Sequence, residues 1–474
     1  MSKYKRLGRN IFLVFLGNVG SKLIGFLMIP FYTKWLSVEE YGTSDNILIY
    51  VSLLLTIVTL SISDSIFIFP KDQEINKQKE YFSSGLLYSA FLLFVTGLVL
   101  YCVKEILIAY KALESIVFNI GYIYLLIIAF FLQNFFQQFS QSINKLKVYT
   151  ISGVLLTFLT AFFSFILIPK YAINGFFIAQ ILSLFIAAIY SAIHSGSYRF
   201  FSLKAVKFYR YSEMARYSIP LIPNAVMWWL VSSLNRPLME EYLGMHAIGI
   251  FAVANKIPTL VNVLFSVFMV SWQISVIEEY KKEGYEKFYN SILKIVFAIL
   301  VFCIVICSVL GETIIKFIVD AKFVEAYRYV PLLCFSVLFS SISGFIGVNF
   351  SASRESKYFF YSSICGAFVA IVFNLILIPV WGLYGAVFTI VLSHLVMVIT
   401  RIGYSWKTVK ITNVLYYILL LLISFIIIMS VTFIDNPTIV SMILLTGSIL
   451  FFLIIRKDIL IGTQSIKAIV RKRK

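Results

Sequence analysis

Three cationic side chains, Lys22, Lys256 and Arg236, lie within or at the edge of long apolar stretches. A charge at the centre of a bilayer costs at least about 2.5–3.5 kcal/mol, so it is expected to face water or a counter-charge. Lys22 lies in the middle of the apolar block 11–32, and Lys256 lies well inside the block 247–272. Cations so placed can bind an anionic group. The alternative is that the lysines snorkel to the nearest interface and that Arg236 anchors its block there.

Carboxamide side chains form a second set of candidates. Gln133, Gln137 and Gln141 recur at helical spacing, so they share one face of a helix. Amides offer both donors and acceptors, as a sugar-rich ligand needs, and we expect this face to line a wet cavity. The other polar candidates for the cavity are Asn18, Asp64, Asn235 and Asn255. Asp64 has an alternative role, which is to balance a lysine or to lie among the headgroups.

The sequence contains no recognisable catalytic set. Its histidines, His194, His246 and His394, have no acid or nucleophile at helical spacing, and its five cysteines show no metal-ligand spacing. It also lacks a glycine-rich loop with the lysine that would bind ATP. A membrane polymerase or glycosyltransferase would need an outer catalytic loop or an acid cluster, and neither is found. We therefore predict a protein that is not an enzyme, with no catalytic residue, no metal site and no bound cofactor.

The elements that must position these residues are apolar helices. Hydrophobic residues make up 60% of the chain and fall into fourteen blocks, and about 20 apolar residues suffice to cross a bilayer. The blocks lack the alternation of barrel strands, so the predicted fold class is an all-α polytopic membrane protein. The blocks are 11–32, 46–69, 81–103, 116–138, 149–168, 174–193, 217–237, 247–272, 289–310, 329–350, 360–379, 383–403, 411–433 and 438–455.

An internal repeat organises these blocks. Residues 151–195 recur 210 positions later at 361–405, for example Ile166-Leu167-Ile168-Pro169 as Ile376-Leu377-Ile378-Pro379. The octet that ends at Gly42 recurs more weakly 207 positions later, ending at Gly249. Six spans per copy leave both copies in the same orientation. The repeat therefore predicts two six-helix lobes related by a pseudo-twofold axis along the membrane normal, with the substrate path between them.

The predicted domains follow from this repeat. The N-lobe is 1–203, the C-lobe is 204–405, and 406–474 holds an extra pair of spans and a basic tail. Spans 1, 2, 7 and 8 are expected to line the path between the lobes. Proline removes a backbone hydrogen bond, so Pro220, Pro223 and Pro258 are expected to bend their helices.

The net charge of +18 reflects orientation in the membrane rather than nucleic-acid binding. With the N-terminus inside, the inner segments hold 29 Lys and Arg residues and the outer segments hold 8. This asymmetry follows the positive-inside rule. We expect a multi-pass membrane protein with both termini and the basic linker 194–216 in the cytoplasm. The basic residues can also contact anionic lipids of the inner leaflet.

Two segments carry a resemblance to a known family. The first runs from Ser21-Lys22 through Pro30 and Thr33 to Glu39-Glu40-Tyr41-Gly42, and the second from Pro220 through Asn235-Arg236 and Gly249 to Ala254-Asn255-Lys256. They resemble the openings of the two lobes of Wzx-like polysaccharide flippases, which carry O-antigen or capsule repeat units. These flippases belong to the multidrug/oligosaccharidyl-lipid/polysaccharide exporter superfamily.

The resemblance implies a V-shaped bundle that moves undecaprenyl-diphosphate-linked oligosaccharides from the inner to the outer leaflet by alternating access. Lys22, Lys256 and Arg236 would bind the diphosphate while the lipid tail stays outside. Implied partners are the lipid-linked glycan, membrane lipids, a polysaccharide polymerase and its chain-length machinery. Coupling to an H+ or Na+ gradient stays open. Asn235 stands where many relatives carry an acid, so an ion-coupling role is not carried over to it.

Two alternatives share this superfamily. A peptidoglycan-precursor (lipid II-type) flippase would also have a cationic lumen and fourteen spans. A multidrug or cation antiporter would need an acid-rich cavity, whereas the residues inside these blocks are mostly basic. The N-terminal segment favours the polysaccharide flippases over both.

Overall fold

The computed structural model describes residues 24–450, apart from 111–113, 407, 435–437, 440, 441, 445 and 448. Every regular element in these residues is a helix, which confirms the all-α prediction. Nine helical stretches among them are long and apolar enough to cross a membrane. Most of the first predicted block and half of the last lie outside the described residues, so the count of fourteen spans stays a prediction.

The chain divides into two compact units. Unit 1 comprises the residues up to Trp229 together with Met239–Gly249, and unit 2 comprises Leu230–Leu238 and the residues from Ile250 onward. The predicted domain boundary between residues 203 and 204 stays a prediction.

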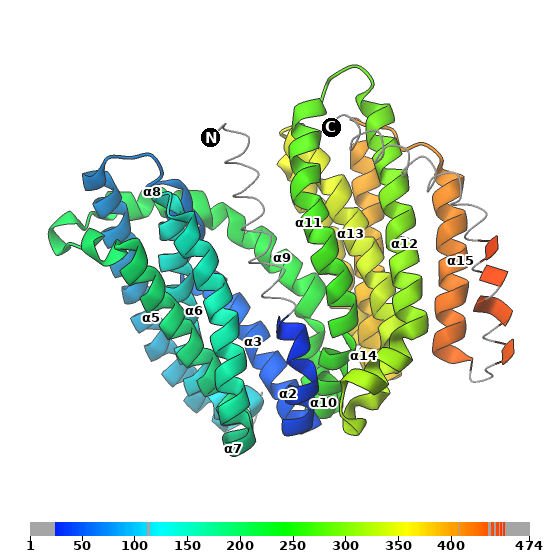
Figure 1. Cartoon of the computed structure of the whole chain (residues 1–474), viewed down its shortest axis with the longest axis horizontal. Helices are drawn as coiled ribbons and strands as arrows, with labels where there is room; N and C mark the ends of the chain where they lie inside the picture. The colour runs from blue at the N-terminus through cyan, green and yellow to red at the C-terminus, as the bar shows by residue number, and fades with distance from the viewer. Residues whose placement is uncertain are drawn as a thin grey trace, which may run out of the picture. The chain divides into compact units, whose positions relative to one another are not determined.

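In unit 1, α5, α6 and α7 lie side by side (Figure 1), and α3 packs against α6 and α7. Helix α3 begins with a capping box, in which Ser37 Oγ accepts a hydrogen bond from Glu40 N and Glu40 Oε2 accepts one from Ser37 N. The helices of this unit are α2 (Ile29–Trp35), α3 (Val38–Val58), α4 (Ile62–Ile68), α5 (Ile75–Tyr110), α6 (Glu114–Ser142), α7 (Leu146–Ser195) and α8 (Phe208–Ser218), with 3-10 turns η1 (Ser197–Phe200), η2 (Leu203–Ala205) and η3 (Ile219–Leu221).

In unit 2, α13 is the central helix and contacts α11, α12, α14 and α15 (Figure 1). Nearly all of its residues are buried. The elements of this unit are α11 (Lys256–Glu279), α12 (Tyr285–Ile318), η4 (Ala321–Tyr329), α13 (Val330–Ala352), α14 (Ser356–Ser405) and α15 (Val414–Phe433). Helices α9 (Ile222–Ser233) and α10 (Asn235–Ala254) contribute residues to both units.

Three predicted spans are interrupted. The second is broken between α3 and α4, where Leu60 and Ser61 both have φ near +50°. In the seventh, η3 separates α8 from α9 at Pro220, whereas Pro223 and Pro258 lie within α9 and α11. The eighth is divided at Asn255, between α10 and α11. Hydropathy does not detect such breaks because the apolar character continues across them.

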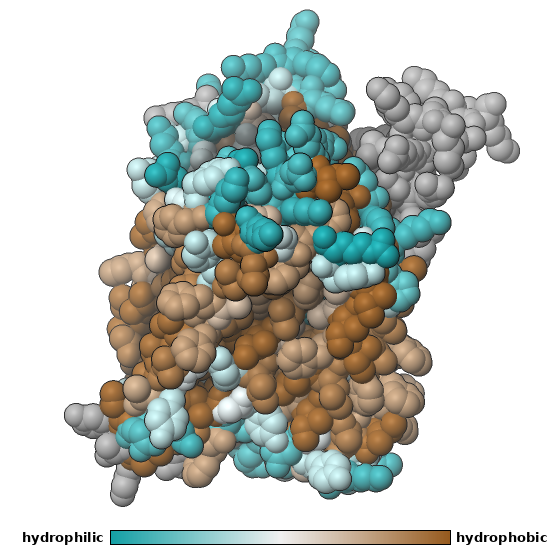
Figure 2. Space-filling model, turned by 90° about the vertical axis from the view of Figure 1, so that its left-hand side faces the viewer, coloured by the Kyte–Doolittle hydropathy of each residue, from teal (hydrophilic) through white to brown (hydrophobic). Residues whose placement is uncertain are grey.

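The surface supports a membrane location. Figure 2 shows a broad apolar band on one face, with hydrophilic side chains above and below it. Large apolar side chains are exposed along α5 and α7, including Phe91, Phe94, Leu98, Phe158 and Phe162. Apolar side chains facing outward between two polar zones are what a bilayer requires. The chain is a multi-pass membrane protein.

The repeat predicted from the sequence is present in the backbone. Helices α7 and α14 are each two helices joined at a sharp turn, at Ala172 (φ 48°, ψ −128°) and at Gly382 (φ 57°, ψ −134°). These positions are 210 residues apart, as are Asn144 (φ 62°) and Arg354 (φ 61°), which precede the two hairpins. The predicted spans 149–168 and 174–193, and their counterparts 360–379 and 383–403, are thus confirmed as two equivalent hairpins.

Equivalent glycines close the two hairpins. A Cβ atom added to Gly175 would lie 2.3 Å from Leu167 O, and one added to Gly385 would lie 2.0 Å from Leu377 O. The two arms of each hairpin therefore touch through their backbones. This close approach explains why glycine stands at the same place in both copies.

Candidate functional site

The predicted cationic residues do not meet in one described cluster. Lys22 and Asn18 lie outside the described residues. Lys256 is the first residue of α11 and Asn255 the cap of α10, and both are partly exposed. Instead of lying deep in one continuous helix, as we expected, Lys256 thus stands at a junction of two helices.

Arg236 is 4% exposed and bonds within its own part of the chain. Its Nη1 donates to Ser232 O at 3.0 Å and to Asn235 Oδ1 at 3.2 Å. The guanidinium lies over the Phe251 ring, 4.8 Å from its centre. Asn235 is 1% exposed. In this conformation Arg236 has protein contacts where we expected substrate contacts.

Asp64 lies in the first turn of the short helix α4 and is exposed. The break at Leu60 and Ser61 creates a new helix N-terminus immediately before it. A carboxylate is favoured there because the first backbone N–H groups carry partial positive charge. The break therefore places Asp64 at the start of a helix, and its predicted role in a cavity stays a prediction.

The carboxamide face of α6 joins two helices. Gln133 Nε2 donates to Gln137 Oε1 at 2.8 Å, and Gln137 Nε2 donates to Tyr149 O of α7 at 2.9 Å. Gln133 is 3% exposed, whereas Gln141 is partly exposed. The structure thus shows a bond between helices where we expected a cavity wall. Spacing alone places residues on a face but does not say what that face contacts.

The equivalent place in unit 2 contains a buried cation that the sequence did not identify. Arg401 of α14 is fully buried, although we counted it among the inner-loop charges. Its Nε donates to Ser362 Oγ at 2.9 Å and its Nη1 to Ser343 O at 2.6 Å. The guanidinium lies 4.1 Å from the centre of the Phe359 ring. In unit 1 the residue 210 positions earlier is Ser191.

The two cores have different side chains at equivalent positions of the repeat. In unit 1, Ser191 Oγ donates to Ser152 Oγ at 2.7 Å, and Ser152 is the counterpart of Ser362. Gln133 and Gln137 correspond to Ser343 and Gly347. The small residues of α13 leave room for the guanidinium of α14. In unit 1, the amide of Gln137 on α6 lies against Tyr149 O and Gly153 of α7. Each core is filled by a compensating set.

The two octets of the weaker repeat contact each other within unit 1. A Cβ on Gly42 would lie 2.3 Å from Met245 O, and a Cβ on Gly249 would lie 2.0 Å from Val38 O. Met245 corresponds to Val38, and Gly249 to Gly42, in the shift of 207 residues. The contact is therefore reciprocal, as at a local twofold axis. Any larger side chain would separate the two backbones.

A segment follows each hairpin, the first exit after α7 and the second exit after α14. Side chains hold the two exits by hydrogen bonds to equivalent backbone groups. After α7, Ser83 Oγ donates to Phe200 O at 3.1 Å and accepts from Ser202 N at 2.9 Å. After α14, Asn290 Nδ2 donates to Lys410 O at 2.9 Å and Asn290 Oδ1 accepts from Thr412 N at 2.8 Å. Residues 410 and 412 are the counterparts of 200 and 202.

The first exit is also held by charge. Glu80, the counterpart of Asn290, pairs with Lys207 at 2.7 Å and with Arg210 at 3.0 Å. The hydrogen bond from Lys207, helped by the one from Arg210, holds the pKa of Glu80 below its usual value, while partial desolvation acts in the opposite direction. The basic linker is thus tied to α5 by ion pairs as well as by serine hydroxyls.

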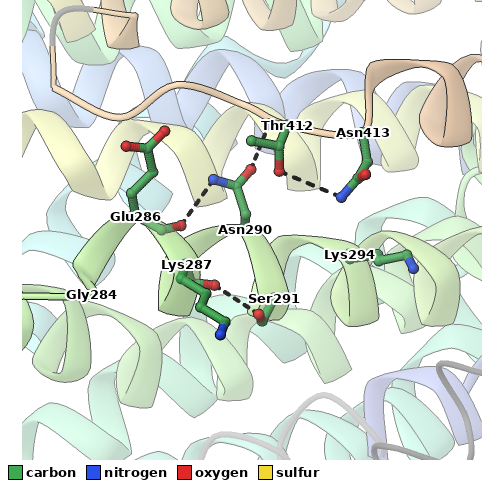
Figure 3. Close-up of a pocket in the computed structure, with 8 residues that line it drawn as sticks. All are labelled: Gly284, Glu286, Lys287, Asn290, Ser291, Lys294, Thr412 and Asn413. Carbon is green, nitrogen blue, oxygen red and sulfur yellow. Dashed lines mark hydrogen bonds between the residues drawn. The ribbon is translucent and has the colours of Figure 1, made fainter.

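The second exit borders an open groove of about 510 Å³ in unit 2. Figure 3 shows α12 along one side, with Lys287, Asn290 and Lys294, and the exit segment along the other, with Thr412 and Asn413. Asn290 Nδ2 also donates to Glu286 O at 2.9 Å, so its bonds fix the exit segment to α12. None of the predicted site residues lines this groove.

Residues 7–273 match the family model described as polysaccharide biosynthesis protein. The match covers more than half of the chain. The chain belongs to this family. A curated relative is the capsular polysaccharide biosynthesis protein CapF of Staphylococcus aureus, 23% identical over 195 residues. That alignment covers 40% of this chain and 49% of CapF, so the chain spans about half the length of the curated relative it matches.

Solved structures show the same fold at low sequence identity. The lipid II flippase MurJ in an inward closed conformation has a TM-score of 0.62 and 15% identity, covering 94% of this chain and 99% of MurJ. An inward-facing multidrug resistance MATE family transporter has a TM-score of 0.64 and 14% identity, with coverage of 82% and 94%. A MOP superfamily transporter from Pyrococcus furiosus has a TM-score of 0.57 and 15% identity, with coverage of 84% and 94%. This member of the polysaccharide biosynthesis family therefore has the MOP-superfamily transporter fold.

Proposed function

We propose that this protein moves undecaprenyl-diphosphate-linked oligosaccharide repeat units from the inner to the outer leaflet of the bacterial cytoplasmic membrane by alternating access. Family membership over residues 7–273 is the observation that carries the proposal. The similarity to CapF favours a capsular glycan. The fold shared with the lipid II flippase supports a lipid-linked cargo. Both termini are cytoplasmic in this proposal, no cofactor is bound, and an H+ or Na+ gradient is the candidate energy source.

Lys22 and Lys256 bind the diphosphate in this proposal, because an ammonium group among apolar helices needs water or an anion beside it. Arg236 belongs to the same site and must leave Ser232 O and Asn235 to reach a substrate. The partly exposed Gln141 and Asn255 are candidates for contacts with the sugars. A polysaccharide polymerase and its chain-length machinery are the proposed partners.

Complementation of a flippase-deleted, polymer-producing strain tests the proposal. Lys256→Ala should reduce polymer export at least about tenfold, since one charged hydrogen bond to a phosphate contributes about 1.5–3 kcal/mol. Lys256→Arg should keep part of the activity because the charge remains while its geometry changes. Lys282→Ala is the matched control, because Lys282 is exposed and pairs with Glu279. Export should be scored against the amount of protein in the membrane.

Export by Lys256→Ala at the wild-type rate would remove Lys256 from the substrate site. The cargo class has its own test in cells depleted of their lipid II flippase. Rescue of those cells, without rescue of polymer export, would show that the chain carries the peptidoglycan precursor instead.

A further inference from the structure

The open groove of unit 2 carries more positive than negative charge. Lys287 and Lys294 line it, and Glu286 is the acid among its lining residues. Lys287, Ser291 and Lys294 follow one another at steps of four and three along α12, so they share one face of this helix (Figure 3). Within the described part of the chain, Lys287 forms no ion pair. The groove is therefore suited to an anionic ligand.

The equivalent place in unit 1 contains an acid of its own. Glu80 stands 210 positions before Asn290 and pairs with Lys207 and Arg210. In unit 2 this position holds an amide, whose three hydrogen bonds connect the second exit to α12. Asn290 thus ties the same two segments together without adding negative charge to the groove.

Several groups around the groove can donate hydrogen bonds to an anion. Lys294 Nζ lies 4.6 Å from the centre of the Tyr416 ring, which places the ammonium group beside the start of α15. Thr412 and Asn413 add an exposed hydroxyl and an exposed amide just before that helix. Helices α12 and α15 both begin at the groove, and the first turn of a helix carries partial positive charge. Ammonium, amide and hydroxyl donors at two helix starts match the oxygen atoms of a phosphate ester.

The groove lies at the depth of a lipid headgroup. The predicted spans 289–310 and 411–433 both begin beside it, and the segments 273–288 and 401–410 are cytoplasmic in the predicted orientation. Further along α12, Phe302 and Ile306 are 52% and 38% exposed. They follow Ser291 by about three and four helical turns, so they lie on nearly the same side of the helix. Acyl chains can therefore run along them while a headgroup occupies the groove.

We propose that the groove binds the phosphodiester headgroup of an anionic phospholipid from the inner leaflet. Lys287 and Lys294 bind the phosphate, and Thr412 and Asn413 donate hydrogen bonds to its oxygen atoms. The Glu286 carboxylate accepts hydrogen bonds from hydroxyl groups of the headgroup, which favours phosphatidylglycerol. Basic pockets between helices on the cytoplasmic side suit such headgroups.

The bound lipid would hold the start of α12 against the second exit, in addition to the bonds of Asn290. It is a lipid that stays with the protein, so the proposal does not depend on which lipid-linked glycan is carried.

Thermal unfolding of the purified full-length chain in mixed micelles tests the proposal. Phosphatidylglycerol replaces phosphatidylcholine at constant total lipid in a neutral detergent. A ligand that binds only the folded state raises the Tm as its concentration exceeds the Kd, so phosphatidylglycerol should raise the Tm in a saturable way. Lys287→Ala should increase the lipid concentration at half of this rise by about five- to tenfold. Lys282→Ala is the matched control and should leave it unchanged, because Lys282 is a lysine of the same cytoplasmic segment outside the groove.

Two substitutions of Ser291 test the charge of the groove at constant size. Ser291 is exposed on the face that carries the two lysines. Ser291→Asp places a carboxylate about one helical turn from each lysine and should abolish the rise of the Tm. Ser291→Asn introduces a side chain of nearly the same size without the charge and should keep the rise. The difference between the two variants isolates the effect of charge from that of shape.

Several results would overturn the assignment. An equal weakening in Lys282→Ala would show general attraction of the lipid to a basic surface. A response that survives both Lys287→Ala and Ser291→Asp would place the lipid elsewhere, and no rise with phosphatidylglycerol would mean that no such lipid binds. An equal rise with glycerophosphoglycerol, the same headgroup without acyl chains, would assign the groove to a free phosphate ester instead. Polymer export is measured separately in cells, so a chain that binds the lipid but fails in export contradicts only the proposed function.

Discussion

The α6–α7 core of unit 1 and the α13–α14 core of unit 2 use equivalent positions for different chemistry. Unit 1 places the amides of Gln133 and Gln137 on one helix and a small Ser191 on the next. Unit 2 places small residues on the first helix and the guanidinium of Arg401 on the second. The turns at Ala172 and Gly382 nevertheless have nearly the same dihedral angles. The backbone of the repeat is therefore preserved while the buried side chains change in compensating sets.

The largest expected difference between the two cores comes from removing Arg401. Arg401→Ala leaves Ser343 O and Ser362 Oγ without their donor and opens a cavity, which together should cost about 3–5 kcal/mol. The equivalent change in unit 1, Ser191→Ala, removes one neutral hydrogen bond and should cost about 1 kcal/mol. Thermal unfolding of the detergent-solubilised protein measures both. Equal losses in the two variants would show that the guanidinium is not central to the core of unit 2.

The next largest effect is expected when the space that α13 leaves for the Arg401 guanidinium is filled. A Cβ on Gly347 would lie 2.8 Å from Arg401 Nη1 and 2.7 Å from the Phe359 ring. Gly347→Ala should therefore overpack the core and cost about 1–3 kcal/mol. Gly344→Ala on the same helix is the control, since its nearest neighbour would be Met269 Cε at 3.9 Å. A Gly347→Ala protein as stable as this control would contradict the compensating arrangement.

The sequence predicted the repeat well because turns and glycines keep their identity. Pro169 and Pro379, with Gly175 and Gly385, mark the two hairpins directly. The buried polar contacts could not be predicted in the same way. Arg401 stands at a span edge and was counted as a loop charge, because hydropathy reports composition and not contact. Glu240 of α10, which accepts hydrogen bonds from Asn46 of α3 and Ser115 of α6, was also missed, because these partners are far away in the sequence.

A smaller effect of opposite sign is expected at the two turns. Ala172 has a positive φ that L side chains rarely adopt, whereas Gly382 adopts the equivalent conformation without a Cβ. Ala172→Gly should relieve strain and stabilise the fold by about 0.5–1 kcal/mol, after the entropy of a freer unfolded chain is subtracted. Gly382→Ala should cost about 1–2 kcal/mol. If the unfolding midpoints of both variants shifted in the same direction, the two turns would not share a preference for glycine, and the expectation would be wrong.

The smallest effect separates the two exits, because a titrating carboxylate, Glu80, helps to hold the first exit segment, whereas the amide of Asn290 holds the second. The folded pKa of Glu80 lies below its usual value, so its contribution to stability is complete above the unfolded pKa of about 4.3 and is lost as the pH falls through the folded pKa. Asn290 does not titrate. As the pH falls from 7 to about 3, below the usual pKa of a glutamate, hydrogen exchange relative to intrinsic rates should therefore rise in residues 198–207 and stay unchanged in 408–412. The rise should be modest, because ion pairs that water still reaches contribute little and the hydroxyls of Ser83 and Ser84 remain bonded. Glu80→Gln should already show the faster exchange at pH 7 and should remove the further response to acid. An equal response of both segments would mean that ion pairs do not distinguish the two exits.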